Sequence, residues 1–363
     1  MQRQRPPKPI KKRPSRQAKT VVSAAPPGKK PAGKGRLAFT IAAIVLVIAI
    51  IAGAAYYMVA VQPFQRVILS VGDDSIKTGY FLKRMVASQG MTADSVIQSL
   101  TAELIIRQQA AAMGFPAVTE QDINDYLRNI AKGENETISD TDYDKWFQER
   151  LDTTGLTAEE FNKVIEGEIL AQSVQDTIGA QVNPQVPQAH VWIIVLDTQE
   201  NAANAKVRID GGESFDTVAK EVSLDTTSKE NGGDMGWQIP ELFSTQISSV
   251  IDTLDIGKCS DPVAFSQQDS TTGATNTSYL LLMVSEKSAA MQATDTQLSQ
   301  LKYKAFLDWL SAQEASTEIV FHGLNGSTTL DDQTSAWITY QVQKLIRKLP
   351  GSTTTESTTS TTP

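Results

Sequence analysis

The chain has 363 residues, of which 33 are Lys or Arg and 41 are Asp or Glu, with 40% hydrophobic residues and a formal net charge of −8. This length suits two or three folding units, and the hydrophobic content is sufficient for a packed core, which excludes a wholly disordered protein. One cysteine, Cys259, excludes an intramolecular disulfide, and the two histidines, His190 and His322, lie far apart in the sequence. We therefore expect no metal site and no cofactor.

The N-terminal segment is strongly basic. Residues 1–36 hold twelve Lys or Arg and no Asp or Glu, which leaves a net charge of −20 on the rest of the chain. We predict a disordered cytoplasmic tail that lies against anionic lipid. A basic segment can also bind nucleic acid, but this one lacks interleaved aromatic residues, and we expect no nucleic-acid partner.

The next segment is apolar. Residues 37–61 run for twenty-five positions without a charge, enough for a helix that crosses about 30 Å of hydrocarbon. A cleaved signal peptide, the alternative, has an apolar stretch of only about 7–15 residues, although Ala52-Gly53-Ala54 loosely fits a cleavage pattern. We predict a single transmembrane helix that anchors the protein in the lipid bilayer. Because basic flanks stay in the cytoplasm, the N-terminus is expected to be cytoplasmic and the acidic body extracytoplasmic.

The body begins with a short strand at 67–71 and then changes to helical periodicity. Thr119 is expected to open one helix. Thr157 and Glu160 have the spacing of a capping box, in which a hydroxyl and a carboxylate each satisfy a free amide at a helix start. We predict a helical domain over residues 62–182.

A different pattern follows a linker, which we place at residues 181–189 because its two prolines remove amide donors and favour extended chain. The pattern predicts a compact α+β domain over residues 183–288, of ordinary domain size. Its expected elements are an apolar strand at 190–196, a helix at 200–209, a glycine-rich loop at 231–237 and a second apolar strand at 279–284.

The remaining segment, residues 289–350, contains an amphipathic helix with Leu301, Phe306 and Trp309 on one stripe. Such a stripe needs a partner, and we predict that it packs back on the helical domain, which makes the α+β domain an insertion. Residues 351–363 are rich in Thr and Ser, lack large apolar residues and are expected to be a disordered tail. The predicted fold class is α+β, with an N-terminal transmembrane helix, a helical region, an inserted α+β domain and a C-terminal amphipathic helix.

The α+β segment carries a series of short motifs. In chain order they are His190 at the head of an apolar strand, Gly211-Gly212-Glu213-Ser214-Phe215-Asp216, Ser223-Leu224-Asp225, Gly232-Gly233-Asp234 with Gly236-Trp237, and Gly257 followed by Ser260-Asp261-Pro262-Val263. At this spacing, residues 190–287 resemble the parvulin family of peptidyl-prolyl cis/trans isomerases. With the helical region before and the amphipathic helix after, about residues 67–315 resemble the SurA and PrsA exported foldases, and the region 62–182 is similar to the SurA N-terminal chaperone domain.

The resemblance implies which residues carry the function. His190 falls on the first of the two family histidines, and Asp225 falls on a catalytic Asp or Cys of the family, so both are implied as catalytic. The implied substrate-binding residues are Phe243 and Ile247, which match the apolar floor under the proline ring, and Ser223 and Thr277, which are weaker candidates for the same hydrogen-bond network.

Four of these residues also have a purely structural role open to them. His190 can orient its strand by hydrogen bonds. Asp225 belongs to a residue type that commonly caps loops. Phe243 and Ile247 belong to types that are most often found in the core.

The sequence departs from the family in two places. The second family histidine corresponds to Leu280, and an insertion at 266–277 precedes it. PrsA-type proteins commonly carry a lipid-bearing cysteine after the signal sequence, whereas this chain has no cysteine near residue 55, so the transmembrane helix is expected to serve as the anchor.

The resemblance therefore implies a membrane-anchored foldase. It would isomerise X-Pro bonds, whose rotation barrier is ~18–20 kcal/mol, by binding the twisted amide more tightly than the planar one, and would also bind unfolded exported chains as a chaperone. Because Leu280 replaces a family histidine, a second interpretation stays open, in which the protein is a holdase with a degenerate isomerase domain.

Overall fold

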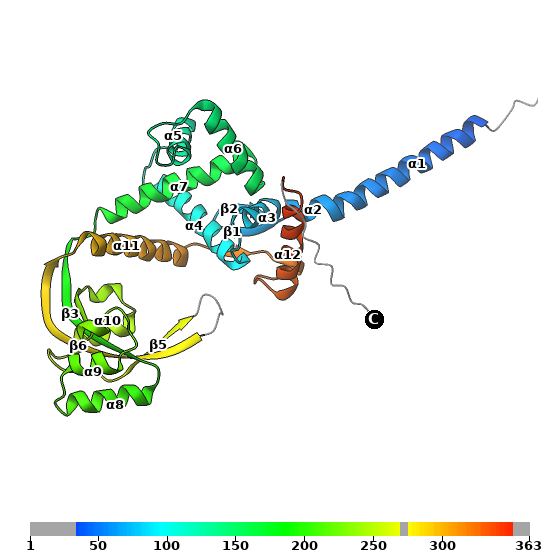
Figure 1. Cartoon of the computed structure of the whole chain (residues 1–363). Helices are drawn as coiled ribbons and strands as arrows, with labels where there is room; N and C mark the ends of the chain where they lie inside the picture. Colours follow the sequence, from blue (N-terminus) through cyan, green and yellow to red (C-terminus); the bar gives the residue numbers. More distant parts are fainter. Residues whose placement is uncertain (1–33, 269–274, 351–363) are drawn as a thin grey trace, which may run out of the picture. The chain divides into compact units, whose positions relative to one another are not determined.

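The structure is a computed structural model that describes residues 34–268 and 275–350 (Figure 1). The predicted tail at 351–363, almost all of the predicted tail at 1–36, and part of the insertion at 266–277 lie outside the described residues. The chain divides between Gln62 and Pro63 into two compact units.

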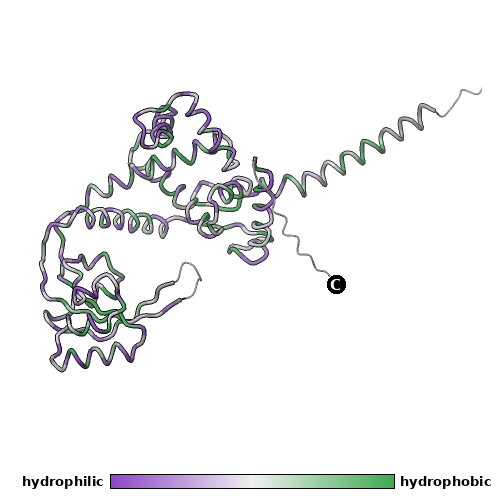
Figure 2. Tube along the Cα trace, in the orientation of Figure 1, coloured by the Kyte–Doolittle hydropathy of each residue, from purple (hydrophilic) through white to green (hydrophobic). Residues whose placement is uncertain are grey.

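The first unit is a long helix. α1 (Lys34–Tyr56) continues through a π-helical turn (Tyr57–Val61) into α2 (Gln62–Gln65). The stretch Ala43–Gln65 has a mean hydropathy of 2.6 and is coloured as hydrophobic over much of its length in Figure 2. Within the described part of the chain it is the one helix that is long and apolar enough to cross a membrane.

The second unit opens with an antiparallel three-stranded sheet in the order β2-β1-β7. β1 (Val67–Val71) and β2 (Asp74–Lys77) form a hairpin whose turn holds Gly72 at φ +55°, a conformation that favours glycine. β7 (Ile319–Phe321) pairs with the other edge of β1. Segments from opposite ends of the unit therefore share one sheet.

Seven helices of the described residues belong to this helical part. Most begin at a Ser or Thr whose hydroxyl accepts a hydrogen bond from an amide three residues later, and α7 has the complete capping box of Thr157 and Glu160 that the sequence predicts. The helices are α3 (Thr78–Ala87), α4 (Ala93–Ala112), α5 (Glu120–Ala131), α6 (Asp140–Thr154), α7 (Ala158–Gly179), α11 (Asp295–Ser316) and α12 (Asp332–Ile346).

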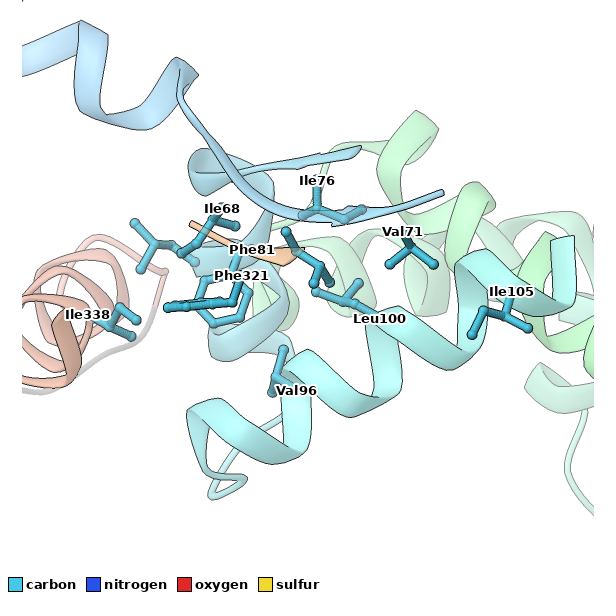
Figure 3. Packing of buried hydrophobic residues seen from close by; sticks show 11 residues of the cluster. Ile68, Val71, Ile76, Phe81, Val96, Leu100, Ile105, Phe321 and Ile338 are labelled. Atoms are coloured by element: carbon cyan, nitrogen blue, oxygen red, sulfur yellow. The ribbon is translucent and has the colours of Figure 1, made fainter. Parts of the chain in front are cut away.

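The core of this part lies between the three-stranded sheet and α3, α4 and α12 (Figure 3). Phe81 of α3 and Leu100 of α4 are fully buried and belong to one cluster with Ile68 of β1. Phe321 of β7 and Ile338 of α12 complete it. Residues that precede Gln185 and residues that follow Gln292 thus form a single hydrophobic core.

A second apolar cluster joins α11 to α4 and α7. Phe306 of α11 clusters with Ile106 of α4 and with Leu170 and Val174 of α7. Trp309 lies on the same side of α11, with its ring stacked on Phe306 at a centroid distance of 6.0 Å. The apolar stripe seen in the sequence is covered by α4 and α7.

Between α7 and α11 the chain forms a four-stranded antiparallel sheet in the order β4-β3-β6-β5. We call residues 185–292 the four-stranded unit. Its strands are β3 (Gln185–Leu196), β4 (Asp234–Gln238), β5 (Val263–Gln268) and β6 (Thr275–Gln292), and its helices are α8 (Gln199–Asp210), α9 (Phe215–Val222) and α10 (Thr245–Thr253). Short 3-10 turns lie at Lys229–Asn231 and Pro240–Leu242, and a third outside this unit at Leu324–Gly326.

The linker predicted at 181–189 is wrong in its second half, where β3 already begins at Gln185. Pro187 lacks an amide donor, but it falls at a register shift between Val186 and Gln188, where the ladder with β6 is interrupted anyway. The glycine-rich loop predicted at 231–237 is likewise partly strand, because β4 pairs with β3 there. Proline is tolerated at a bulge and glycine at a sheet edge, so these residues did not mark a linker or a loop here, and both predictions were partly wrong.

Candidate functional site

The two faces of the four-stranded sheet carry different side chains, because successive residues of a strand point to opposite sides. Ile193 and Val195 of β3 and Leu280 of β6 point to the side that α10 covers. Ile194 and Leu281 point to the side that α8 and α9 cover. We call these sides the α10 face and the α8/α9 face.

A half-buried apolar patch lies on the α10 face. Phe243 follows the turn Pro240–Leu242, and Ser244 caps α10 with its hydroxyl 3.5 Å from the amide of Ile247. This cap presents Phe243 and Ile247, four residues apart, to the sheet. We define the apolar patch as the partly exposed residues of this cluster that adjoin Leu280, namely Ile193, Val195, Phe243, Ile247 and Phe265.

Leu280 forms part of the floor of this patch. It pairs with Val195 of β3 and with Val263 of β5, and only 6% of its surface is exposed. The position that the resemblance assigns to the second family histidine is therefore buried and apolar. A proline ring resting on the patch would meet hydrocarbon there rather than an imidazole.

His190 lies on the α8/α9 face, away from the apolar patch. Its Nε2 lies 2.8 Å from Oδ1 of Asp234, and its Nδ1 lies 3.0 Å from Oγ of Ser285. The indole N–H of Trp192 donates to the same Ser285 oxygen at 3.2 Å. A carboxylate can only accept, so a neutral His190 ring carries its proton on Nε2 and donates it to Asp234. Nδ1 then accepts from the Ser285 hydroxyl, whose oxygen accepts from the Trp192 indole.

Stacking fixes the His190 ring further. The ring of Trp237 lies parallel to it, with centroids 5.7 Å apart and planes inclined by 17°. Trp237 belongs to β4 and is the sheet partner of His190. With both nitrogens bonded and one face stacked, the imidazole connects β3, β4 and β6.

Ser223 and Asp225 lie on the loop that runs along the free part of β3. The amide of Leu224 donates to the carbonyl of Val195 at 2.8 Å. The hydroxyl of Ser223, which is almost fully buried, accepts from the amides of Val195 and Asp225, both at 3.2 Å. Ser223 therefore holds the loop against β3 at Val195, and Asp225 follows two residues later on the same loop.

The carboxylate of Asp225 is half-buried and oriented by its own loop. It accepts hydrogen bonds from the amide of Ser228 at 2.9 Å and from the Ser228 hydroxyl at 2.5 Å. Partial burial raises the pKa of Asp225, but the hydrogen bonds from Ser228, and then those from Thr227, outweigh it and hold the pKa below its usual range. Asp225 is therefore a fixed anion at neutral pH.

Thr277 is the most remote of the predicted residues. It is exposed on the hairpin of β5 and β6, where its hydroxyl lies 3.3 Å from that of Ser266. The structure thus brings Phe243 and Ile247 together with Leu280, holds the loop of Ser223 and Asp225 against β3 at Val195, and places His190 and Thr277 elsewhere.

Sequence reasoning missed three residues of the patch, Ile193, Val195 and Phe265. The signal for the first two is their alternation with Ile194 and Leu196, which becomes informative only once the covered faces are known. Phe265 immediately precedes the insertion predicted at 266–277, and no local pattern marks it.

No group of three or more His, Cys, Asp or Glu within residues 34–268 and 275–350 is arranged to hold a metal ion. Cys259 is half-buried beside the α8/α9 cluster, and burial raises the pKa of its thiol to about 11. The thiol is therefore protonated and behaves as a small core residue.

Comparison with known proteins gives relatives of the four-stranded unit. Residues 196–275 match the family model described as the PPIC-type PPIASE domain of rotamases. The chain is 28% identical over 152 residues to the foldase protein PrsA of Oceanobacillus iheyensis, which covers 41% of this chain and 44% of that protein. It is 40% identical over 74 residues to PrsA of Clostridium kluyveri, which covers 20% of this chain and 21% of that protein.

The matched part of these relatives is limited to about half of their length or less. Among solved structures, a peptidylprolyl isomerase (PrsA) from Bacillus anthracis aligns at a TM-score of 0.37 and 20% identity, over 69% of this chain and 94% of that chain. At this TM-score the likeness does not establish a shared overall arrangement.

Proposed function

We propose that the whole protein is a membrane-anchored foldase that isomerises X-Pro bonds in exported polypeptides and holds their unfolded segments. The premise is that this chain carries a parvulin-type, PPIC-class peptidyl-prolyl cis/trans isomerase domain. The observation that supports it best is the half-buried apolar patch on the domain that matches the isomerase family. The fixed carboxylate of Asp225, on the loop bonded to β3 at Val195, adds to it.

The patch provides a physical route to catalysis. A planar amide owes its stiffness to charge separation between its oxygen and nitrogen, and water stabilises that separation. A proline seated on Phe243, Ile247 and Leu280 loses this water, so the planar form is destabilised relative to the twisted one. No covalent step and no cofactor are needed.

Asp225 would act in the same direction. The carbonyl oxygen of a planar amide is more negative than that of a twisted amide, because twisting breaks the conjugation. A nearby anion therefore disfavours the planar form more than the twisted form. The hydrogen bonds from Ser228 keep the carboxylate ionised and oriented, so that it need not reorganise during the rotation.

His190 has no direct part in this proposal, because it lies on the other face of the sheet. Its place is to position β4, and through β4 the turn that leads to Phe243. Ser223 is likewise a positioning residue, which holds the Asp225 loop to β3. Thr277 has no role that its surroundings support.

The helix Ala43–Gln65 would anchor the protein, with the basic segment in the cytoplasm and the body outside. Uncatalysed proline isomerisation takes tens to hundreds of seconds, so an isomerase held at the membrane would meet exported chains before they fold. The partners would be unfolded or newly exported polypeptides with X-Pro bonds, and the lipid bilayer.

A second candidate function is that of a holdase without turnover. The observation that favours it is Leu280, which leaves no imidazole on the α10 face within the described residues. In that case the apolar patch would bind clients but not accelerate rotation. Suppression of client aggregation with no isomerase rate would select this function.

A protease-coupled assay on proline peptides tests the foldase proposal. The full chain in detergent should accelerate isomerisation, and Asp225→Ala should slow it by about 10²-fold, the low end of what the loss of one preorganised electrostatic group costs. Asp216→Ala is the matched control, since it removes an acid of the same unit that pairs with Lys220 on α9. Equal rates for the native chain and for Asp225→Ala would remove Asp225 from the mechanism.

A further inference from the structure

The four-stranded sheet ends in an open edge at β5, next to the apolar patch. The amides of Gly257 and Ser260 donate to the carbonyls of Val284 and Leu282, each at 2.8 Å. The backbone groups of the even-numbered residues of β6 therefore face β5. Along the same strand the odd-numbered residues turn their backbone groups toward β3.

This alternation decides which groups of β5 are free. Val263 and Phe265 lie opposite Leu280 and Ser278, so their backbone groups point into the sheet. The N–H and C=O groups of Ala264 and Ser266 must then point out of the sheet. Both residues are exposed, and no other described strand pairs with this edge.

We propose that an extended, proline-containing segment of a client adds to this edge as an antiparallel strand. The inference rests on the client-binding role proposed above and specifies how the client is held. The outward donors and acceptors of Ala264 and Ser266, which pair with no strand of the described residues, match those of an extended chain, so the edge is complementary to a backbone rather than to particular side chains. A foldase that serves many clients needs this kind of complementarity.

Antiparallel pairing also determines which positions of the client can hold proline. Client residues opposite Ala264 and Ser266 must donate their N–H groups to β5, so proline is excluded there. Client residues opposite Val263 and Phe265 point their N–H groups away from the sheet, and proline is allowed.

Residues directly opposite each other in a sheet share a face. The positions that allow proline are therefore the positions whose side chains point to the α10 face, where Val263 and Phe265 themselves point. There the ring would meet Phe265 at the margin of the apolar patch. In a parallel pairing the relation reverses, and proline would be excluded from that face.

The test uses peptides with a single central proline, bound to the full chain in detergent. N-methylation of the residue on either side of the proline removes a donor to β5 and should weaken binding by about fivefold to tenfold. N-methylation two residues away removes an outward N–H and should leave the affinity within about twofold.

A protein variant tests the same edge from the other side. Ala264→Pro removes one outward N–H while leaving the bonds to β6 intact, and it should weaken peptide binding by about fivefold to tenfold. Ala264→Val is the matched control, which keeps the N–H and favours the strand. The N-methyl peptides decide the matter on the unaltered protein if Ala264→Pro fails to fold.

The outcomes separate this inference from the proposed function. Peptides that bind and isomerise with no dependence on the site of N-methylation would overturn the inference and leave the foldase proposal standing. Failure of every proline peptide to bind would overturn both. A dimer that Ala264→Pro disrupts would assign the edge to pairing between copies of this chain and overturn the client assignment.

Discussion

Gly233 joins the Asp225 loop to β3, and replacing it with alanine should disrupt the four-stranded unit. Gly233 has φ +90°, which an L-residue adopts at a cost of about 1–2 kcal/mol. An added Cβ would lie 2.4 Å from the carbonyl oxygen of Ile193, where ordinary contact begins at 3.4 Å. Relieving this clash would break the 2.8 Å hydrogen bond from the Ile193 amide to the Gly233 carbonyl, which adds about 1 kcal/mol. The expected loss is about 2–3 kcal/mol.

Gly236→Ala provides the matched control. Gly236 also has a positive φ, +68°, but an added Cβ would meet no atom within 4 Å. It should therefore cost only the conformational term, about 1–2 kcal/mol. Urea unfolding gives the free energies, and hydrogen exchange at the Ile193 amide reports the local opening. Equal losses for the two variants would refute the inferred contact between the loop and β3.

Three further predictions concern other parts of the chain. Glu160→Gln should lower stability at pH 7 but not near pH 3. Partial burial raises the pKa of Glu160, but hydrogen bonds from Lys83 and Thr157 outweigh it and lower the pKa, so the stabilisation is lost as the pH falls through the folded pKa. Urea midpoints at the two pH values measure the effect, and an equal effect at both would contradict this prediction. Cys259, with its pKa raised to about 11, should react slowly with a thiol reagent at pH 8 until denaturant is added, whereas immediate labelling of the folded chain would contradict its burial. Phe81→Ala should cost about 3–5 kcal/mol in urea unfolding, since the ring is fully buried in the core shown in Figure 3, and a loss below about 1 kcal/mol would contradict that packing.

The sequence predicts elements well where one local pattern dominates. The capping box of Thr157 and Glu160 and the apolar run that follows determine the start of α7, because both depend on neighbours three or four residues away. The start of β3 was misplaced because the bulge that accommodates Pro187 is a property of its pairing with β6. That pairing is about a hundred residues away in sequence and leaves no local signal.

In the candidate site, too, some residues could be predicted from the sequence and others depend on strand pairing. Phe243 and Ile247 could be chosen from the resemblance, and the structure places them together with Leu280. His190 heads a continuous apolar strand, and such a run does not reveal which face each side chain takes. Its place beside Asp234 depends on β4, whose residues were predicted as a loop.

The central claim is that the apolar patch lowers the barrier to rotation of an X-Pro bond. NMR exchange spectroscopy of a proline peptide with catalytic amounts of the full chain in detergent measures the interconversion of cis and trans isomers directly. We expect exchange cross-peaks with the native chain and a rate reduced by at least tenfold in the double variant Phe243→Ala, Ile247→Ala. An exchange rate equal to that of the free peptide, with peptide bound to the native chain, would contradict the claim.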